Sequence, residues 1–130
     1  MGNRVITIDR EFEYGEKFNT FFCGDIHLDS PGHDRRLFLE EMADALVNEA
    51  DIVVLGDIFD LIQHGDHKRF TPSSNKYGAT DTAMNSAIEE AVELLTPFAK
   101  NIKVMLCGNH ESSAIKYHNI DMADLLKWEV

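Results

Sequence analysis

Three apolar segments of the chain end in the same way, because in each a glycine is followed at once by Asp or Asn. The segments read FFC-Gly24-Asp25, VVL-Gly56-Asp57 and MLC-Gly108-Asn109. Short apolar runs bounded by turn residues are typical of strands that are buried on both faces. Between the runs, apolar residues recur at helical spacing. Strands that alternate with helices in this way indicate βαβ units. We therefore expect an α/β fold with a mainly parallel βαβαβ sheet flanked by helices.

The remaining elements follow from local patterns. Apolar residues at helical spacing predict two helices before the last strand and one after it. β-Branched and aromatic residues predict two strands near the N-terminus, joined by a turn at YGEK. We expect helices over residues 34–50, from 81 or 82 to about 100, and 121–128, strands over 4–8 and 18–22, and a polar loop over 63–80.

Polar side chains follow each of the three buried runs. Because the carboxyl ends of parallel strands lie along one edge of a sheet, these side chains should converge there. They are Asp25, His27, Asp57, Asn109 and His110. Taken one at a time, each could be a turn former or a helix cap. Together, carboxylates, an imidazole and an amide oxygen suit Mn, Fe, Zn, Co or Mg, and a cation removes the repulsion between bunched carboxylates. We therefore expect a divalent metal site at this edge.

Composition excludes several other classes of protein. The net charge of -11 argues against unassisted binding to duplex DNA, which depends on clustered Lys and Arg. The chain has neither a Gly-x-x-x-x-Gly-Lys loop nor a Gly-x-Gly-x-x-Gly turn for nucleotide phosphates. Its N-terminus lacks an apolar stretch of signal length, and no apolar run approaches the ~20 residues of a membrane span. We expect a soluble cytoplasmic protein with no membrane partner.

The order and spacing of the motifs resemble those of the calcineurin-like metallophosphoesterase superfamily. The motifs are Asp25-x-His27, Gly56-Asp57-x-x-Asp60 and Gly108-Asn109-His110-Glu111. The sequence around these motifs is similar to that of phosphoesterases predicted in bacteriophages and bacteria. It reads GDIHLDSPGHDRRLF, GDIFDL and GNHESS. The likeness covers about residues 18–118 and implies the first half of an α/β/β/α sandwich.

The resemblance implies a dinuclear metal site and a hydrolytic activity. Asp25 and His27 would hold the first metal, Asp57 would bridge both, and Asn109 would bind the second through its amide oxygen. The two divalent ions, most simply Mn, would activate a hydroxide that attacks phosphorus in a phosphomonoester or phosphodiester. Nucleic acid, a nucleotide and a phosphoprotein are all candidate substrates.

The resemblance also implies roles outside the metal shell. His110 would protonate the leaving oxygen or steady charge in the transition state, and Asp60 would hydrogen-bond His110 and hold its orientation. Glu111 is expected to be structural and to bond the backbone nearby. From the residues alone, the cations Lys68, Arg69 and Lys76 of the polar loop are expected to help hold the substrate phosphate.

The chain departs from the family pattern after its third motif. That pattern continues with a His and a Gly-His-x-His on a second sheet, whereas this chain has only His118 after His110. We therefore expect residues 1–130 to form one domain that resembles the amino-terminal half of the family fold, whether as a truncated chain, a split gene product or a natural half. The alternative to an enzyme is a non-catalytic or regulatory metal-binding half-domain. Either could self-associate or pair with a separate carboxy-terminal half.

Overall fold

A three-stranded parallel sheet forms the centre of the computed structural model, which describes residues 5–60, 76, 83–118 and 121–130. The strands are β1 (Thr20–Cys23), β2 (Asp51–Val54) and β3 (Ile102–Met105), and they lie in the order β1-β2-β3. β2 pairs with both neighbours, with Thr20 opposite Asp51 on one side and Val54 opposite Met105 on the other. The α/β fold class with a parallel sheet is confirmed, and all three predicted buried strands are present.

Four helices in the described part of the chain accompany the sheet. They are α1 (Arg35–Val47), α2 (Ala83–Leu95), α3 (Asn109–His118) and α4 (Met122–Glu129), and a short 3-10 turn, Thr96–Phe98, follows α2. The Asp34 carboxylate accepts a hydrogen bond from the Leu37 amide at 3.0 Å and so caps α1. Asp121 caps α4 in the same way, through the Asp124 amide at 2.9 Å. The predicted helices are therefore confirmed near their predicted starts, whereas α3 was not predicted.

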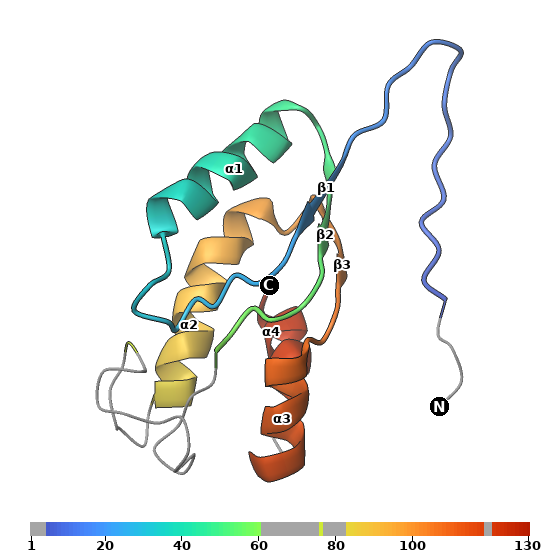
Figure 1. Cartoon of the computed structure of the whole chain (residues 1–130). Helices are drawn as coiled ribbons and strands as arrows, with labels where there is room; N and C mark the ends of the chain where they lie inside the picture. The colour runs from blue at the N-terminus through green and yellow to red at the C-terminus, as the bar shows by residue number, and fades with distance from the viewer. Residues whose placement is uncertain (1–4, 61–75, 77–82, 119–120) are drawn as a thin grey trace.

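One face of the sheet carries the hydrophobic core. Figure 1 shows α1 and α2 on one side of the strands and the N-terminal segment on the other, and α4 contacts both α2 and α3. Ile52 and Val54 of β2 are fully buried beneath the helices, together with Met42, Leu95 and Leu126. Burying each such side chain contributes roughly 1.5–3 kcal/mol to folding. The core therefore holds the three strand ends in fixed positions relative to one another.

The opposite face of the sheet is only partly covered by the described residues. It carries Phe22, whose exposed fraction is 61%, and Leu106, whose exposed fraction is 37%. The predicted strand over residues 4–8 is wrong for its described part, because residues 5–8 run outside any strand. No strand in the described part of the chain lies beside them to exchange main-chain hydrogen bonds. An open groove of about 700 Å³ lies between this segment and the sheet.

A partly buried ion pair ties the N-terminal segment to the sheet. The guanidinium of Arg10 donates to both carboxylate oxygens of Asp51, a residue only 1% exposed at the start of β2. Arg10 also lies over the ring of Phe18, 5.1 Å from its centroid. Among the helices that the structure describes, none is long and apolar enough to cross a bilayer. The predicted loop over residues 63–80 lies outside the described residues except for Lys76.

Candidate metal centre

The segments that leave β1 and β2 run side by side beyond the strands. The Asp57 carbonyl accepts from the amides of Ile26 and His27 at 2.9 and 3.1 Å. The Ile58 carbonyl then accepts from the Leu28 amide at 2.8 Å. The parallel pairing of the sheet is thus continued by main-chain hydrogen bonds, which bring the first two motifs together.

A buried carboxylate joins the third motif to the second. Glu111 is 0% exposed and accepts from the amides of Asp57 at 3.0 Å, Phe59 at 2.9 Å and Gly108 at 2.9 Å. These three amides are donors that the strands and helices leave without a main-chain partner, and a carboxylate with two oxygens can satisfy them together. The expected structural role of Glu111 is confirmed.

Three of the predicted metal ligands have an unusual backbone. Asp25, His27 and Asp57 have φ angles of 50°, 48° and 50°, and Glu49 is the only other non-glycine residue with a positive φ in the described chain. Residues in such sparsely populated regions cost of order 1–3 kcal/mol each and gather at functional sites. The fold therefore holds these side chains in directions that an ordinary strand exit would not give them.

The glycines that end β2 and β3 permit a close approach of the second and third motifs. A Cβ on Gly56, which has φ +100°, would lie 2.5 Å from the Gly108 nitrogen. A Cβ on Gly108 would overlap the carboxylate of Asp57. The two strand ends can lie against each other only because neither residue has a side chain.

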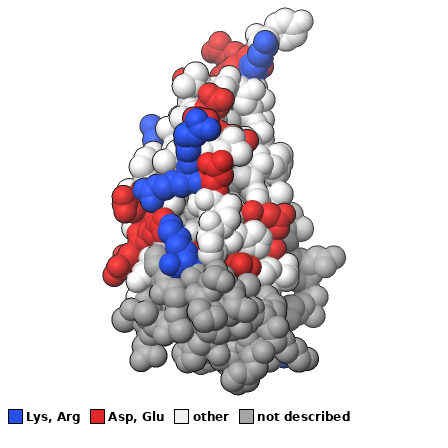
Figure 2. Space-filling view, turned by 60° about the vertical axis from the view of Figure 1, so that its left-hand side comes forward, with Lys and Arg blue, Asp and Glu red and all other residues white. Residues whose placement is uncertain are grey.

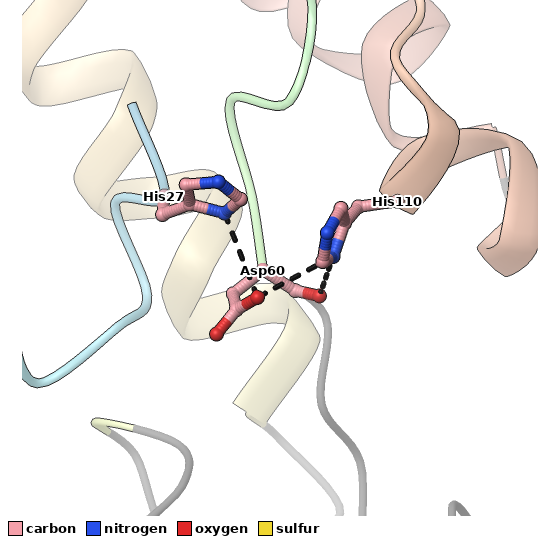
Figure 3. A group of neighbouring side chains, drawn as sticks. All are labelled: His27, Asp60 and His110. Atoms are coloured by element: carbon pink, nitrogen blue, oxygen red, sulfur yellow. Dashed lines mark hydrogen bonds and ion pairs between the residues drawn. The ribbon is translucent and has the colours of Figure 1, made fainter. Parts of the chain in front are cut away.

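His27, Asp60 and His110 form the centre of the site (Figure 3). One side-chain ligand atom of each lies within 4.8 Å of the others. Asp60 Oδ1 lies 3.5 Å from His27 Nδ1 and 3.3 Å from His110 Nδ1, and the two rings meet edge to face with centroids 5.0 Å apart. Each of the three residues comes from a different motif, so the structure brings together one side chain from each of the three strand ends.

The contact between Asp60 and His110 differs in one respect from the expected one. The shorter approach is from His110 Nδ1 to the main-chain oxygen of Asp60, at 2.6 Å, and the Asp60 carboxylate is farther away. A carbonyl oxygen can only accept, so Nδ1 of His110 must carry a proton. Asp60 therefore sets the tautomer of His110 through its backbone as well as lying beside the ring.

The other predicted ligands surround this centre. Asp25 Oδ1 lies 3.8 Å from His27 Nε2, and its side chain is 85% exposed. Asp57 Oδ1 accepts from the His110 amide at 3.0 Å. Asn109 is exposed at the first position of α3. The structure therefore gathers His27, Asp60 and His110, links Asp57 to them through the backbone, and leaves Asp25 and Asn109 on the solvent side.

Lys76 is the one predicted phosphate-binding cation that lies among the described residues; Lys68 and Arg69 lie outside them. The ammonium group of Lys76 lies 2.5 Å from Glu90 Oε1, and Arg35 contacts the same oxygen at 3.2 Å. Figure 2 shows acidic side chains flanking the basic ones on the face that it presents. Lys76 is therefore paired with a carboxylate of α2 in this conformation.

Asp29 is a residue of the site that sequence reasoning missed. It is 2% exposed, and its Oδ1 accepts from the Asp60 amide at 2.5 Å. Asp25 and Asp29 each lie two residues from His27, so alternation along an extended chain would put them on one side. The left-handed backbone at Asp25 and His27 breaks that alternation, and no local sequence signal reports it.

The thiol at the end of β1 carries its proton at neutral pH. Burial, together with the nearby carboxylate of Glu41, raises the pKa of the Cys23 thiol to about 11. The thiolate is the form that binds metals and attacks electrophiles, so Cys23 stays inert near neutral pH.

The donor set fits a divalent cation. Imidazole and carboxylate groups are the ligands that Mn, Fe and Zn accept. His27 Nδ1 is buried and has no hydrogen-bond partner among the described residues, since the 3.5 Å to Asp60 is too long for a good hydrogen bond. A buried nitrogen without a partner, held 3.5 Å from the Asp60 carboxylate, is an arrangement that a cation would satisfy.

Comparison with known families agrees with the motif pattern. The family model described as calcineurin-like phosphoesterase matches residues 18–129, which include β1, the three motifs and all of α4. Neither the comparison with curated proteins nor the comparison with solved structures gave a match.

Proposed function

Because the chain belongs to the calcineurin-like phosphoesterase family, we propose that it hydrolyses phosphoesters with the help of divalent cations. The observation that carries the proposal is the meeting of His27, Asp60 and His110 at the carboxyl edge of the sheet, one from each motif. Ligands bind at this edge in open α/β sheets. A phosphomonoester or a phosphodiester would serve as substrate, and a nucleotide, a nucleic acid or a phosphoprotein could provide it.

The residues proposed to hold the cations are the predicted ones. Asp25 and His27 would bind a first ion, Asp57 would be shared, and Asn109 would bind a second, with Mn as the first candidate. When bound, such ions stabilise charge on the phosphoryl oxygens and lower the pKa of water. The left-handed backbone at Asp25, His27 and Asp57 supports this assignment, because it is strain concentrated at the proposed ligands.

His110 is the proposed proton donor to the leaving oxygen. Its Nδ1 proton is engaged by the Asp60 carbonyl, so the proton available for transfer is the one on Nε2 of the cationic ring. Its main chain is fixed independently, because the His110 amide donates to Asp57 Oδ1. The first contact fixes the ring, and the second fixes the main chain to which the ring is attached.

A second candidate function is a non-catalytic or regulatory metal-binding module that needs a partner chain. Two observations favour keeping it. The sequence contains no Gly-His-x-His, and the sheet has an open apolar face that includes Phe22 and Leu106. In this alternative the site would bind cations, and hydrolysis would require a partner chain with further imidazoles.

Hydrolysis of chromogenic esters separates the two candidates. Bis-(p-nitrophenyl) phosphate and p-nitrophenyl phosphate would be offered to the chain with Mn, Mg or Zn, with EDTA as the blank. Metal-dependent release of nitrophenol that His110→Ala and Asp57→Asn abolish supports the enzyme. Mn binding by calorimetry without turnover of either ester supports the module, and absence of both overturns the proposed function.

A further inference from the structure

Asp29 is a buried carboxylate to which the proposed function assigns no role. Its side chain is shielded from solvent, and Oδ1 accepts from the Asp60 amide at 2.5 Å. A hydrogen bond from a backbone amide to a carboxylate is stronger than one between neutral groups. Leaving a buried amide without its acceptor destabilises the folded state. Asp29 therefore determines where the backbone of Asp60 lies.

Asp60 in turn contacts both histidines of the site. Its main-chain oxygen accepts from His110 Nδ1 at 2.6 Å, while its carboxylate lies 3.3 Å from that nitrogen and 3.5 Å from His27 Nδ1. The amide that donates to Asp29 and the carbonyl that accepts from His110 belong to the same residue. A displacement of the Asp60 backbone would therefore move the group that sets the tautomer of His110.

We propose that Asp29 is a positioning residue of the hydrolytic site, which acts on His110 and His27 through Asp60. The inference rests on the proposed function for its consequence in catalysis, but not for its structural content. It assigns Asp29 no contact with substrate or cation. Its requirement is an acceptor oxygen at the place of Oδ1, which accepts from the Asp60 amide.

This requirement separates a positioning role from a merely structural one. Asp29→Asn keeps an acceptor oxygen at nearly the same place, so it should behave like the parent chain. Asp29→Ala removes the acceptor, and Asp29→Glu moves it by one methylene. Asp51→Asn is the matched control, because Asp51 is an equally buried carboxylate at the opposite end of β2, where it is bonded by Arg10 and not by the site.

The first measurement uses the ring nitrogen signals of the full chain, labelled with ¹⁵N at histidine and free of metal. The His110 signals are identified by their loss in His110→Gln. We expect the parent chain, Asp29→Asn and Asp51→Asn to show His110 as the Nδ1–H tautomer. Asp29→Ala and Asp29→Glu should lose that preference and shift the His27 signals as well. Should Asp29→Ala fail to fold, Asp29→Glu carries the test alone.

The second measurement is Mn-dependent hydrolysis of bis-(p-nitrophenyl) phosphate. We expect Asp29→Glu to lower kcat by about 10²-fold, the scale for a misplaced catalytic group, with KM changed far less. Asp29→Asn should retain activity. If the parent chain hydrolyses neither ester, the proposed hydrolytic activity fails, and the ring signals still decide the role of Asp29. Unchanged His110 signals in both Asp29→Glu and any folded Asp29→Ala, or equal changes in Asp51→Asn, would overturn the inference.

Discussion

Asp57 lies in the second motif and contacts the segments of the other two motifs. Its carbonyl accepts from the amides of Ile26 and His27, its amide donates to Glu111, and its Oδ1 accepts from the His110 amide. Asn at this position keeps the size of the side chain and an oxygen for the His110 amide, and it removes the negative charge. The Asp57→Asn substitution therefore tests cation binding with little disturbance of the fold.

We expect Asp57→Asn to weaken Mn binding at least ~10-fold, since even residues behind a ligand change metal affinity by that amount. Isothermal titration of the metal-free chain with MnCl₂ measures the effect. Asp44→Asn, a change on the exposed part of α1, is the control and should bind Mn like the parent chain. Equal affinity in Asp57→Asn and the parent chain would show that Asp57 is not a ligand.

His110 has two possible roles that one substitution separates. It lies in the same cluster as His27 and Asp60, yet its Nδ1 is already bonded to the Asp60 carbonyl. As a proton donor it can be removed without loss of the cation. We expect His110→Ala to bind Mn nearly as the parent chain does and to lose ~10²–10⁴-fold in kcat, the usual contribution of general acid–base catalysis. Loss of Mn binding in the same titration would make His110 a ligand.

At the scale of elements, the site depends on how closely the ends of β2 and β3 approach. Gly56 and Gly15 both have positive φ angles, +100° and +86°, but only Gly56 has neighbours within 4 Å of an added Cβ. Substitution of Gly15 therefore tests backbone strain alone, whereas substitution of Gly56 tests backbone strain together with steric overlap.

We expect Gly15→Ala to destabilise the chain by about 1 kcal/mol, through its backbone conformation alone. Gly56→Ala adds a clash with the backbone of Gly108, so it should cost several times as much and weaken Mn binding. Urea unfolding followed by circular dichroism gives both values. Similar losses in the two variants would mean that the close approach does not limit the fold.

Helix α3 is held against the second motif by its buried Glu111. Removal of this carboxylate leaves the amides of Asp57, Phe59 and Gly108 without acceptors. Each buried unsatisfied donor costs about 1–3 kcal/mol, so Glu111→Ala should lower the free energy of unfolding by at least ~3 kcal/mol.

Glu111→Gln retains one acceptor oxygen and should fall between Glu111→Ala and the parent chain. Glu40→Ala is the control, because Glu40 is 60% exposed and makes only a 3.8 Å surface ion pair with Arg36. Chemical unfolding of the four proteins gives the ranking. A Glu111→Ala variant as stable as Glu40→Ala would contradict the role of Glu111 as the clamp between the motifs.

At the scale of the whole molecule, the two faces of the sheet differ in how they are covered. α1 and α2 lie on one side of the sheet (Figure 1). Phe22, Leu106 and the groove of about 700 Å³ mark the other side. Large exposed apolar patches on soluble chains mark interaction sites, and closed homodimers are the commonest assemblies. We expect the chain to self-associate through this face.

Light scattering after size-exclusion chromatography tests the association. Phe22→Lys combined with Leu106→Lys should shift the parent oligomer to a monomer without unfolding it, because both side chains are exposed. Val47→Lys is the matched control, since Val47 is 81% exposed at the end of α1, away from the groove. A parent chain that is already monomeric at all concentrations would contradict self-association.

The sequence by itself determined the parts of this protein that depend on local chemistry. Strand burial, helix caps and glycine-terminated strand ends follow from the residues nearby, and they predicted three parallel strands, α1, α2 and α4, and one edge where the motifs meet. The prediction of a strand near the N-terminus was wrong for residues 5–8. A strand needs a neighbouring strand with which to exchange hydrogen bonds, and the composition of these residues carries no information about that neighbour.

Only the tertiary structure decided which side chains meet. Asp25 and Asp29 have the same chemistry and the same separation from His27, yet one is exposed and the other is buried against the Asp60 amide. Asp60, expected to orient one histidine, lies between two. These outcomes depend on the left-handed turns at Asp25 and His27 and on hydrogen bonds between segments about thirty to fifty residues apart in the chain. Such contacts are fixed when the segments pack together, because the direction of each side chain depends on backbone angles that distant partners stabilise.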